Sequence, residues 1–154
     1  MLPRDDPALI ARWRDAIFHR VSVRSFDRQP IPETSLHQLT KTIDLLQPAA
    51  PAARAVVVDD EPRDILRGAA YGLFAGAQGY IALLGNPKDE RIDQQIGYLG
   101  EGLVLEATAM GLGTCWVGGM FRASNAAKSF AAPGEKVYAI IPLGCPASHS
   151  SLGH

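Results

Sequence analysis

Two arginines and a serine are spaced so that an extended chain would present them together. Arg20, Ser22 and Arg24 alternate within the segment RVSVRSF. Because the side chains of an extended chain alternate between its two sides, these three should lie on one side. Guanidinium groups on either side of a hydroxyl suit a phosphate or another anionic group. The alternative interpretation is a solvated helix end, where Arg20 complements the helix dipole.

A glycine-rich stretch, GLGTCWVGG at residues 111–119, is the second candidate for chemistry. Gly111 stands where a helix C-terminus favours a positive φ, and Thr114–Val117 are predicted to form a short buried strand. Gly118 and Gly119 would let a flat ligand approach the backbone N–H groups. A Rossmann dinucleotide loop needs a strand before its glycines and a helix after them. The predicted order is the reverse, which disfavours a nucleotide-binding Rossmann fold.

The cysteines and histidines predict neither a metal site nor a nucleophile. Cys145 and His149 form only a weak zinc pattern, and Cys115 lies in an apolar strand, where a thiol is inert. Two cysteines fit a reducing compartment better than a disulfide framework. The N-terminus lacks the apolar segment of a secretory signal. A cytoplasmic location and no metal are therefore expected.

The charge of the chain is nearly balanced, with 15 Lys and Arg against 16 Asp and Glu and no basic run, which disfavours nucleic acid as a partner. A length of 154 residues predicts a single domain over residues 1–154, with no fixed structure in residues 147–154. The uncharged segment Gly68–Gly85 is long enough to suggest a membrane span. Its five glycines and marginal length instead favour a glycine-rich turn followed by a buried strand.

Five helices and four strands must position these residues. The predicted helices are Pro7–Val21, Glu33–Leu46, Asp60–Arg67, Ile92–Met110 and Ser124–Phe130. The predicted strands are Ala55–Val58, Tyr80–Leu84, Thr114–Val117 and Val137–Ile141, the last ended by Pro142 and Gly144. Because the strands are almost continuously apolar, helices are expected on both faces of the sheet.

Taken in order, the two motifs resemble those of the FMN-dependent nitroreductase family, and most closely a short subgroup of it. Arg20, Ser22 and Arg24 match an Arg-x-Ser-x-Arg/Lys element that follows the family's first helix. The segments GYLGEGLVLEATAMGLGTCWVGGMF and VYAIIPLGCP match its long helix with the next strand and its final strand. The resemblance spans most of Ala8–Pro146. It implies an α+β fold with a mixed central sheet of about four strands, covered by helices on both faces, in a homodimer.

The resemblance also implies a cofactor and a role for each matched residue. Arg20 and Ser22 would hold the FMN phosphate, and Arg24 would approach the N1/O2 edge of the isoalloxazine. The face of the ring would be lined by Gly118, Gly119 and Met120, with a backbone N–H directed towards N5. The implied activity is NAD(P)H-dependent, two-electron, ping-pong reduction of nitroaromatic, quinone or similar acceptors. No catalytic side chain is required, because the flavin carries the hydride chemistry.

Two segments depart from the family pattern. Pro48–Arg54 lacks the asparagine that would meet the pyrimidine side of the flavin, a place that Arg54 would take instead. Ala147–His154 contains no lysine or arginine to complete the phosphate site. These departures leave two alternatives open: a flavin-binding or flavin-sequestering protein with little or no turnover, and an interaction module that keeps the fold without the cofactor.

Overall fold

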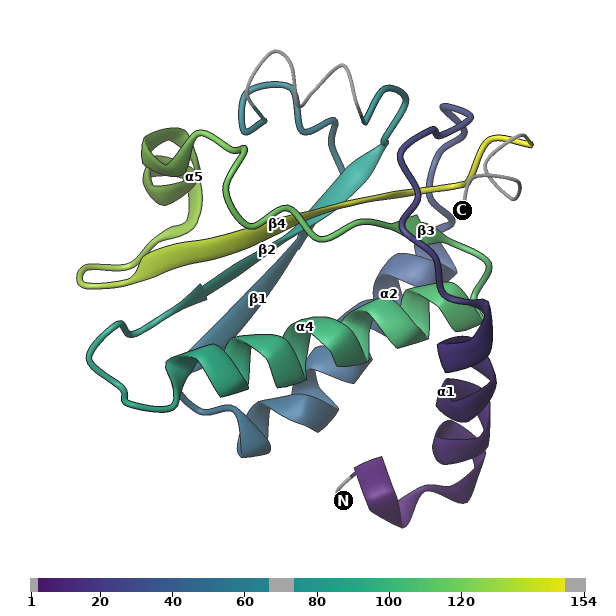
Figure 1. Cartoon of the computed structure of the whole chain (residues 1–154), viewed down its shortest axis with the longest axis horizontal. Coiled ribbons are helices and arrows are strands. Elements are labelled where there is room, and N and C mark those ends of the chain that lie inside the picture. Colours follow the sequence, from purple (N-terminus) through teal and green to yellow (C-terminus); the bar gives the residue numbers. More distant parts are fainter. Residues whose placement is uncertain (1–2, 67–73, 149–154) are drawn as a thin grey trace.

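A four-stranded sheet with helices on both faces forms the centre of the computed structural model, which describes residues 3–66 and 74–148 (Figure 1). The strands are β1 (Ala53–Val58), β2 (Gly79–Gly85), β3 (Gly113–Thr114) and β4 (Lys136–Gly144), in the spatial order β1-β2-β4-β3. All three neighbouring pairs are antiparallel. The prediction of an α+β fold with about four strands is therefore confirmed, whereas the pairing among these strands is antiparallel and not mixed. Within the described residues, the one parallel pairing is an isolated bridge between Ser22 and Thr114.

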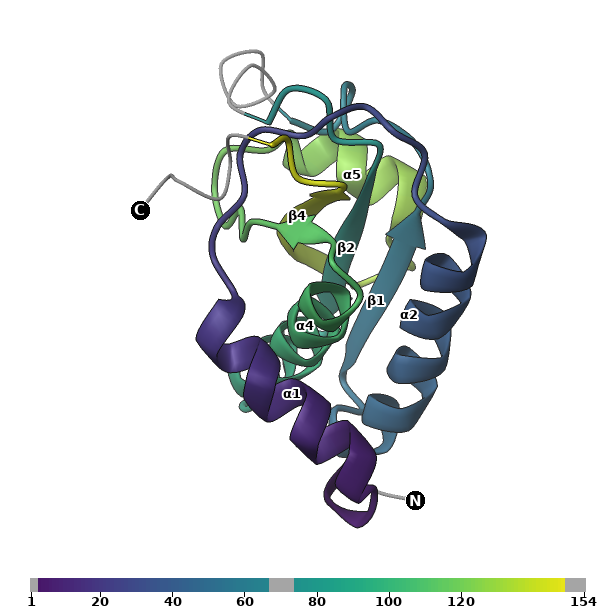
Figure 2. The same cartoon turned by 90° about the vertical axis from the view of Figure 1, so that its right-hand side faces the viewer.

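Three helices, α1 (Pro7–His19), α2 (Glu33–Leu46) and α4 (Ile92–Ala109), lie on one side of the sheet, as Figure 2 shows: α2 and α4 pack on the strands, and α1 packs on α4. The helix α4 lies closest to the sheet, and its Leu99 and Leu103 are fully buried against Ile81 and Ile141. These four side chains belong to one apolar cluster, and their burial is the main force that holds the helices on the sheet. The predicted bounds of α2 and α4 agree with the structure to within one residue.

The helix α1 begins where the sequence predicts. The carboxylate of Asp6 accepts hydrogen bonds from the N–H groups of Ala8 and Leu9, both at 3.1 Å, and Pro7 is the first helical residue. Farther along, Arg12 and the indole N–H of Trp13 both donate to Glu106 of α4. The side chain of Glu106 is only 2% exposed, so this cluster fixes α1 against α4.

The other face of the sheet is covered by α5 (Ala123–Phe130) and by the segments around Leu66 and Phe121. Phe130 packs edge-on against Tyr80 of β2, with ring centroids 6.0 Å apart. The helices on both faces that the apolar strands predict are therefore present. The strand β1, at one edge of the sheet, is mostly half-buried.

The predicted helix Asp60–Arg67 is wrong over its described part. The N–H groups of Ile65 and Leu66 both donate to the carbonyl of Pro62, which makes a single turn. Leu66 then pairs with Phe121, and this bridge takes the chain out of a helical course. Arg67 lies outside the described residues, as do residues 68–73 of the glycine-rich segment. The rest of that segment includes the predicted buried strand, and no helix among the described residues is long and apolar enough to span a membrane.

Two predicted strand boundaries are wrong, and Pro142 explains why β3 is short. The strand β4 does not end before Pro142 but continues to Gly144, whereas β3 contains only Gly113 and Thr114. The register that pairs Gly113 with Gly144 and Val117 with Ile140 would place Cys115 opposite Pro142. Because proline has no N–H to donate, the ladder is interrupted there and resumes only at Val117.

The described part of the C-terminal segment lies against the chain that follows α1. The N–H of Asp27 donates to the carbonyl of Cys145 at 3.0 Å, and the N–H of Ala147 donates to the carbonyl of Ser25 at the same distance. Backbone pairing therefore extends to Ala147, the first residue of the segment expected to lack fixed structure. Residues 149–154 lie outside the described part of the chain.

Candidate functional site

The segment RVSVRSF (residues 20–26), called here the arginine-containing segment, leaves α1 and runs beside β3 (Figure 1). Arg20 caps α1, and its extended backbone (φ −64°, ψ 126°) ends the helix. Ser22 then forms the parallel bridge to Thr114, and the N–H of Val23 donates to the Thr114 carbonyl at 2.9 Å. Two motifs that are almost 90 residues apart in the sequence are therefore hydrogen-bonded neighbours.

Gly113 permits this close approach. A Cβ at Gly113 would lie 2.8 Å from both Cβ and Cγ1 of Val23, closer than carbon atoms of packed side chains come. Val23 itself is buried, whereas Ser22 and Arg24 on either side of it are exposed. The extended segment thus uses Val23 to hold its position and leaves the predicted anion-binding side chains in solvent.

Arg20 lies beside a carboxylate that is itself held in place. Its Nε is 3.9 Å from Oε1 of Glu101 in α4, while Oε2 of Glu101 accepts a hydrogen bond from the indole N–H of Trp116 at 3.0 Å. Trp116 lies two residues after the end of β3 and packs where Gly100 of α4 has no side chain, since a Cβ there would overlap the indole ring. Glu101 therefore connects α4, the glycine-rich stretch and the start of the arginine-containing segment.

The hydrogen-bonding capacity of the predicted anion site is unused. Among the described residues, none accepts a hydrogen bond from the side chains of Arg20 and Arg24, and the Ser22 hydroxyl is likewise unbonded. Two guanidinium groups and a hydroxyl on one exposed segment can bind an anion through several charge-assisted hydrogen bonds. Such a donor set suits a phosphate or another anionic group.

The residues Gly118, Gly119 and Met120 form an exposed turn after the glycine-rich stretch. The turn is fixed at both ends, by the bridge between Val117 and Ile140 and by the bridge between Phe121 and Leu66. A Cβ at Gly118 or Gly119 would meet no atom within 4 Å, so space for a ligand is open over this backbone. Within the described residues, no backbone hydrogen bond or bridge joins this turn to Arg20, Ser22 or Arg24.

Arg54, the suggested replacement for the missing asparagine, is engaged elsewhere. It lies in β1, at the edge of the sheet opposite β3, and donates to both carboxylate oxygens of Glu135 and to the carbonyl of Phe130. The hydrogen bond from Arg54 lowers the pKa of Glu135, and the carboxylate in turn raises the pKa of Arg54. Arg54 therefore fixes the α5–β4 connection instead of joining the arginine-containing segment.

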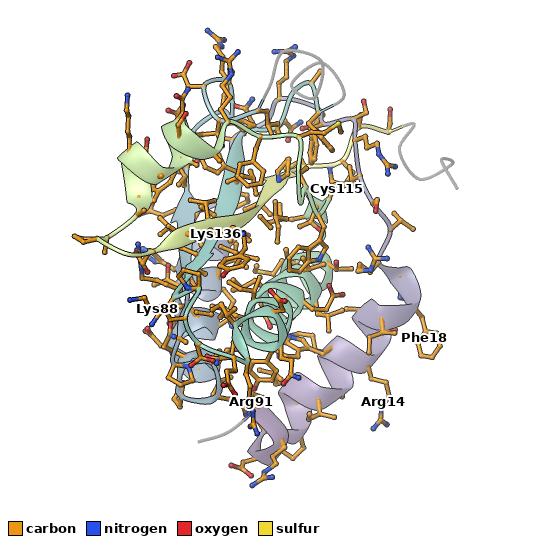
Figure 3. All side chains as sticks on the ribbon, turned by 60° about the vertical axis from the view of Figure 1, so that its left-hand side comes forward. Arg14, Phe18, Lys88, Arg91, Cys115 and Lys136 are labelled. Atoms are coloured by element: carbon orange, nitrogen blue, oxygen red, sulfur yellow. The ribbon has the colours of Figure 1, made fainter. Side chains whose placement is uncertain are left out.

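The cysteines show no sign of nucleophilic activation. Cys115 is buried and points into the body of the protein (Figure 3), and burial together with Asp27 raises the pKa of the Cys145 thiol. Within residues 3–66 and 74–148, no three His, Cys, Asp or Glu side chains cluster as metal ligands. His149 of the weak zinc pattern lies outside these ranges.

A surface cavity of about 470 Å³ lies over the first half of α4. It is lined by Ala49, Pro51, Arg91, Gln94, Gln95 and Tyr98. Because Tyr98 and Glu101 are three residues apart, the cavity opens on the same side of α4 as the Glu101 carboxylate.

Sequence reasoning missed Glu101 and Trp116. The available signal was composition: the second half of α4 is apolar apart from Glu101, Glu106 and a threonine, and the chain has only two tryptophans. Each of these tryptophans donates its indole N–H to one of the two glutamates. A carboxylate within an apolar helix needs a partner, but the sequence alone does not say which one.

The protein has an α+β fold with a candidate site beside its edge strand β3. Comparison with known proteins identifies the family. The family model described as "Putative TM nitroreductase" matches residues 13–152. The chain therefore belongs to this nitroreductase family. Among curated proteins, none matches the sequence.

Solved structures show the same fold at low sequence identity. A nitroreductase family protein from Clostridium novyi NT has a TM-score of 0.72 and 20% identity, with 88% of this chain and 86% of that chain covered. An FMN-dependent nitroreductase from Clostridium difficile R20291 has a TM-score of 0.72 and 18% identity, with 86% and 87% covered. A Clostridium acetobutylicum protein named "Putative NADH Oxidase" has a TM-score of 0.71 and 21% identity, with 89% and 90% covered.

Proposed function

We propose that this protein is a cytoplasmic oxidoreductase that binds FMN and uses NAD(P)H to reduce nitroaromatic, quinone or similar acceptors in a ping-pong cycle. Membership of the nitroreductase family and the FMN-dependent relative support the cofactor. The observation that carries the proposal is the pairing of Ser22 and Val23 with Thr114, because it brings the segment of Arg20, Ser22 and Arg24 next to the glycine-rich stretch.

The residues of both motifs fit the proposed cofactor. Arg20 and Ser22 would bind its phosphate, and Arg24 would place a cation beside the N1/O2 edge, where negative charge accumulates on reduction. The exposed turn of Gly118, Gly119 and Met120 would give the ring a backbone surface without crowding it. The chemistry that FMN supplies when bound is two-electron hydride transfer, so no acid or base on the protein is required.

A second copy of this chain is the partner that we propose. Ile17, Phe18 and Val21 at the end of α1 are 59%, 81% and 46% exposed, and Figure 3 shows Phe18 projecting away from the body of the protein. Tyr98 of α4 is a further large exposed side chain, beside the cavity. A homodimer would bury these apolar side chains. Light scattering should give twice the chain mass, and Phe18→Glu should return the monomer mass.

The competing proposal is a flavin-binding protein with little or no turnover. It is favoured by the pairing of Arg54 with Glu135, since Arg54 then does not replace the missing asparagine. Flavin that NAD(P)H bleaches without oxygen, and that a quinone or nitroaromatic then restores, would exclude this alternative.

Purified protein reconstituted with FMN provides the direct test. Binding should produce a yellow protein, and Arg20→Ala and Arg24→Ala should each raise the Kd for FMN about tenfold or more, since a hydrogen bond to a charged group contributes about 1.5–3 kcal/mol. Lys88→Ala, which removes one exposed positive charge in the β2–α4 turn, is the matched control and should leave the Kd unchanged. A protein that stays colourless would refute the proposal. If both arginine variants bind FMN as the native protein does, the cofactor site lies elsewhere or the protein is an interaction module.

A further inference from the structure

Two glutamates of α4, Glu106 and Glu101, each lie beside one arginine and accept a hydrogen bond from one tryptophan indole. The arginine is in α1 for Glu106 and at the C-cap of α1 for Glu101, and the geometry of the two pairs differs. Glu106 accepts from Arg12 at 3.1–3.2 Å and is almost completely buried. Glu101 and Arg20 approach only to 3.9 Å, and their side chains are 45% and 34% exposed. In the first pair Arg12 donates two hydrogen bonds to the carboxylate, whereas in the second pair Arg20 donates none.

The position of Glu101 is set by Trp116 rather than by Arg20. One carboxylate oxygen accepts the indole N–H at 3.0 Å, and the other faces Arg20 beyond hydrogen-bonding distance. Since Trp116 is held against Gly100, the carboxylate cannot follow Arg20 if the guanidinium turns towards another anion. An exposed ion pair of this length contributes little to folding stability. Its larger effect is on the charge that Arg20 presents to a ligand.

We propose that Glu101 is the resident counter-anion of Arg20, and that a bound phosphate group competes with it for the same guanidinium. The proposal rests on the proposed function, because it takes Arg20 as a phosphate ligand. Glu101 then acts as a positioning residue that lowers the affinity for FMN and makes cofactor retention adjustable. Trp116, within the glycine-rich stretch, keeps the carboxylate beside Arg20 whether or not phosphate is bound.

The test is the substitution Glu101→Gln, which keeps an oxygen acceptor for the Trp116 indole and removes the charge. We expect the Kd for FMN to fall about threefold to fivefold in low salt, the factor that corresponds to an exposed charge interaction of up to about 1 kcal/mol. Riboflavin lacks the phosphate, so its Kd should not change. The gain should disappear in 1 M NaCl, where the Debye length is about 3 Å.

Asp93→Asn is the matched control. Asp93 is exposed on the same helix, and its substitution changes the net charge by the same amount about 12 Å farther along the axis. It should leave the Kd for FMN unchanged. Glu101→Ala should reproduce the gain of Glu101→Gln if the charge, and not the amide, is responsible. The unfolding free energy of each variant reports whether the fold is intact.

A double-variant cycle separates this inference from the proposed function. In an Arg20→Ala background, Glu101→Gln should have no effect on FMN binding, because the competition has been removed. If Arg20→Ala weakens binding but Glu101→Gln leaves it unchanged or weakens it, the counter-anion role is wrong and the cofactor site stands. If Arg20→Ala has no effect, the cofactor site is wrong and this inference fails with it. A gain that extends equally to riboflavin would also overturn the competition for phosphate.

Discussion

Gly113 provides the sharpest test of how the two motifs are held together. A methyl group at this position would lie 2.8 Å from the Cβ and Cγ1 of Val23 and 2.9 Å from its Cγ2. The valine side chain cannot rotate away, because it is branched at Cβ and the Cβ itself makes the contact. The backbone of the arginine-containing segment must therefore move outward in Gly113→Ala.

The size of that movement follows from the contact distances. Ordinary van der Waals contact begins at 3.4 Å, so the segment must shift by about 0.6 Å. The hydrogen bond from Val23 to Thr114 is 2.9 Å long, and a shift of this size takes it to the limit of useful geometry. Overpacking costs about 1–3 kcal/mol and a lost hydrogen bond about 0.5–1.5 kcal/mol. We expect the unfolding free energy to fall by about 2–4 kcal/mol.

Urea unfolding of Gly113→Ala and Gly118→Ala gives the measurement. Both variants lose the backbone freedom of glycine, so that contribution is common to the two proteins. A Cβ at Gly118 meets nothing within 4 Å. The unfolding free energy of Gly118→Ala should therefore stay within about 0.5 kcal/mol of the native value. If the two variants are equally stable, the close packing of Val23 on Gly113 does not hold the motifs together and the reasoning is refuted.

Three further predictions concern the frame around the site. Asp6→Ala should lower the unfolding free energy by about 1 kcal/mol, the usual contribution of an N-cap, measured by urea unfolding against Asp6→Asn. Glu106→Ala should cost about 2–4 kcal/mol in the same assay, because it leaves the indole N–H of Trp13 and the guanidinium of Arg12 without their acceptor; a loss below 1 kcal/mol would contradict this. The hydrogen bond from Arg54 lowers the pKa of Glu135 from its ordinary value of 4.5. The Glu135 carboxylate therefore stabilises the fold above that pH, and this stabilisation is lost as the pH falls. The stability difference between native protein and Glu135→Gln should therefore be largest near neutral pH and shrink below about pH 4.5, and a pH-independent difference would disagree.

Periodicity and capping predicted the helices that form the frame. The apolar spacing of α2 and α4 gave their bounds, Asp6–Pro7 gave the start of α1, and the positive φ of Gly111 (79°) agrees with its predicted place after α4. These features are local, because each depends on residues within one or two turns. The family resemblance and the α+β class were likewise predictable from the motifs and their order.

The errors arose where the outcome depends on a distant partner. The short β3 follows from Pro142, which lies opposite Cys115 only once β4 is paired with it. The segment Asp60–Leu66 leaves its helical turn because Leu66 pairs with Phe121, more than 50 residues away. Glu101 is a comparable case: its spacing places it on α4, but its contacts come from two other segments. Patterns of residue type predict which face is buried, and they do not identify the partner.

The short edge strand accounts for the exposure of the candidate site. Since Pro142 limits β3 to two residues, the neighbouring segment can pair with it only at Thr114, through one bridge and one backbone hydrogen bond. A longer β3 would hold a longer partner strand. Its ladder would fix the backbone on both sides of Ser22 and leave the adjacent arginines less freedom to turn towards an anion. With a single bridge, buried Val23 and Gly113 fix the position of the segment, while the side chains of Arg20, Ser22 and Arg24 donate no hydrogen bond within the described residues.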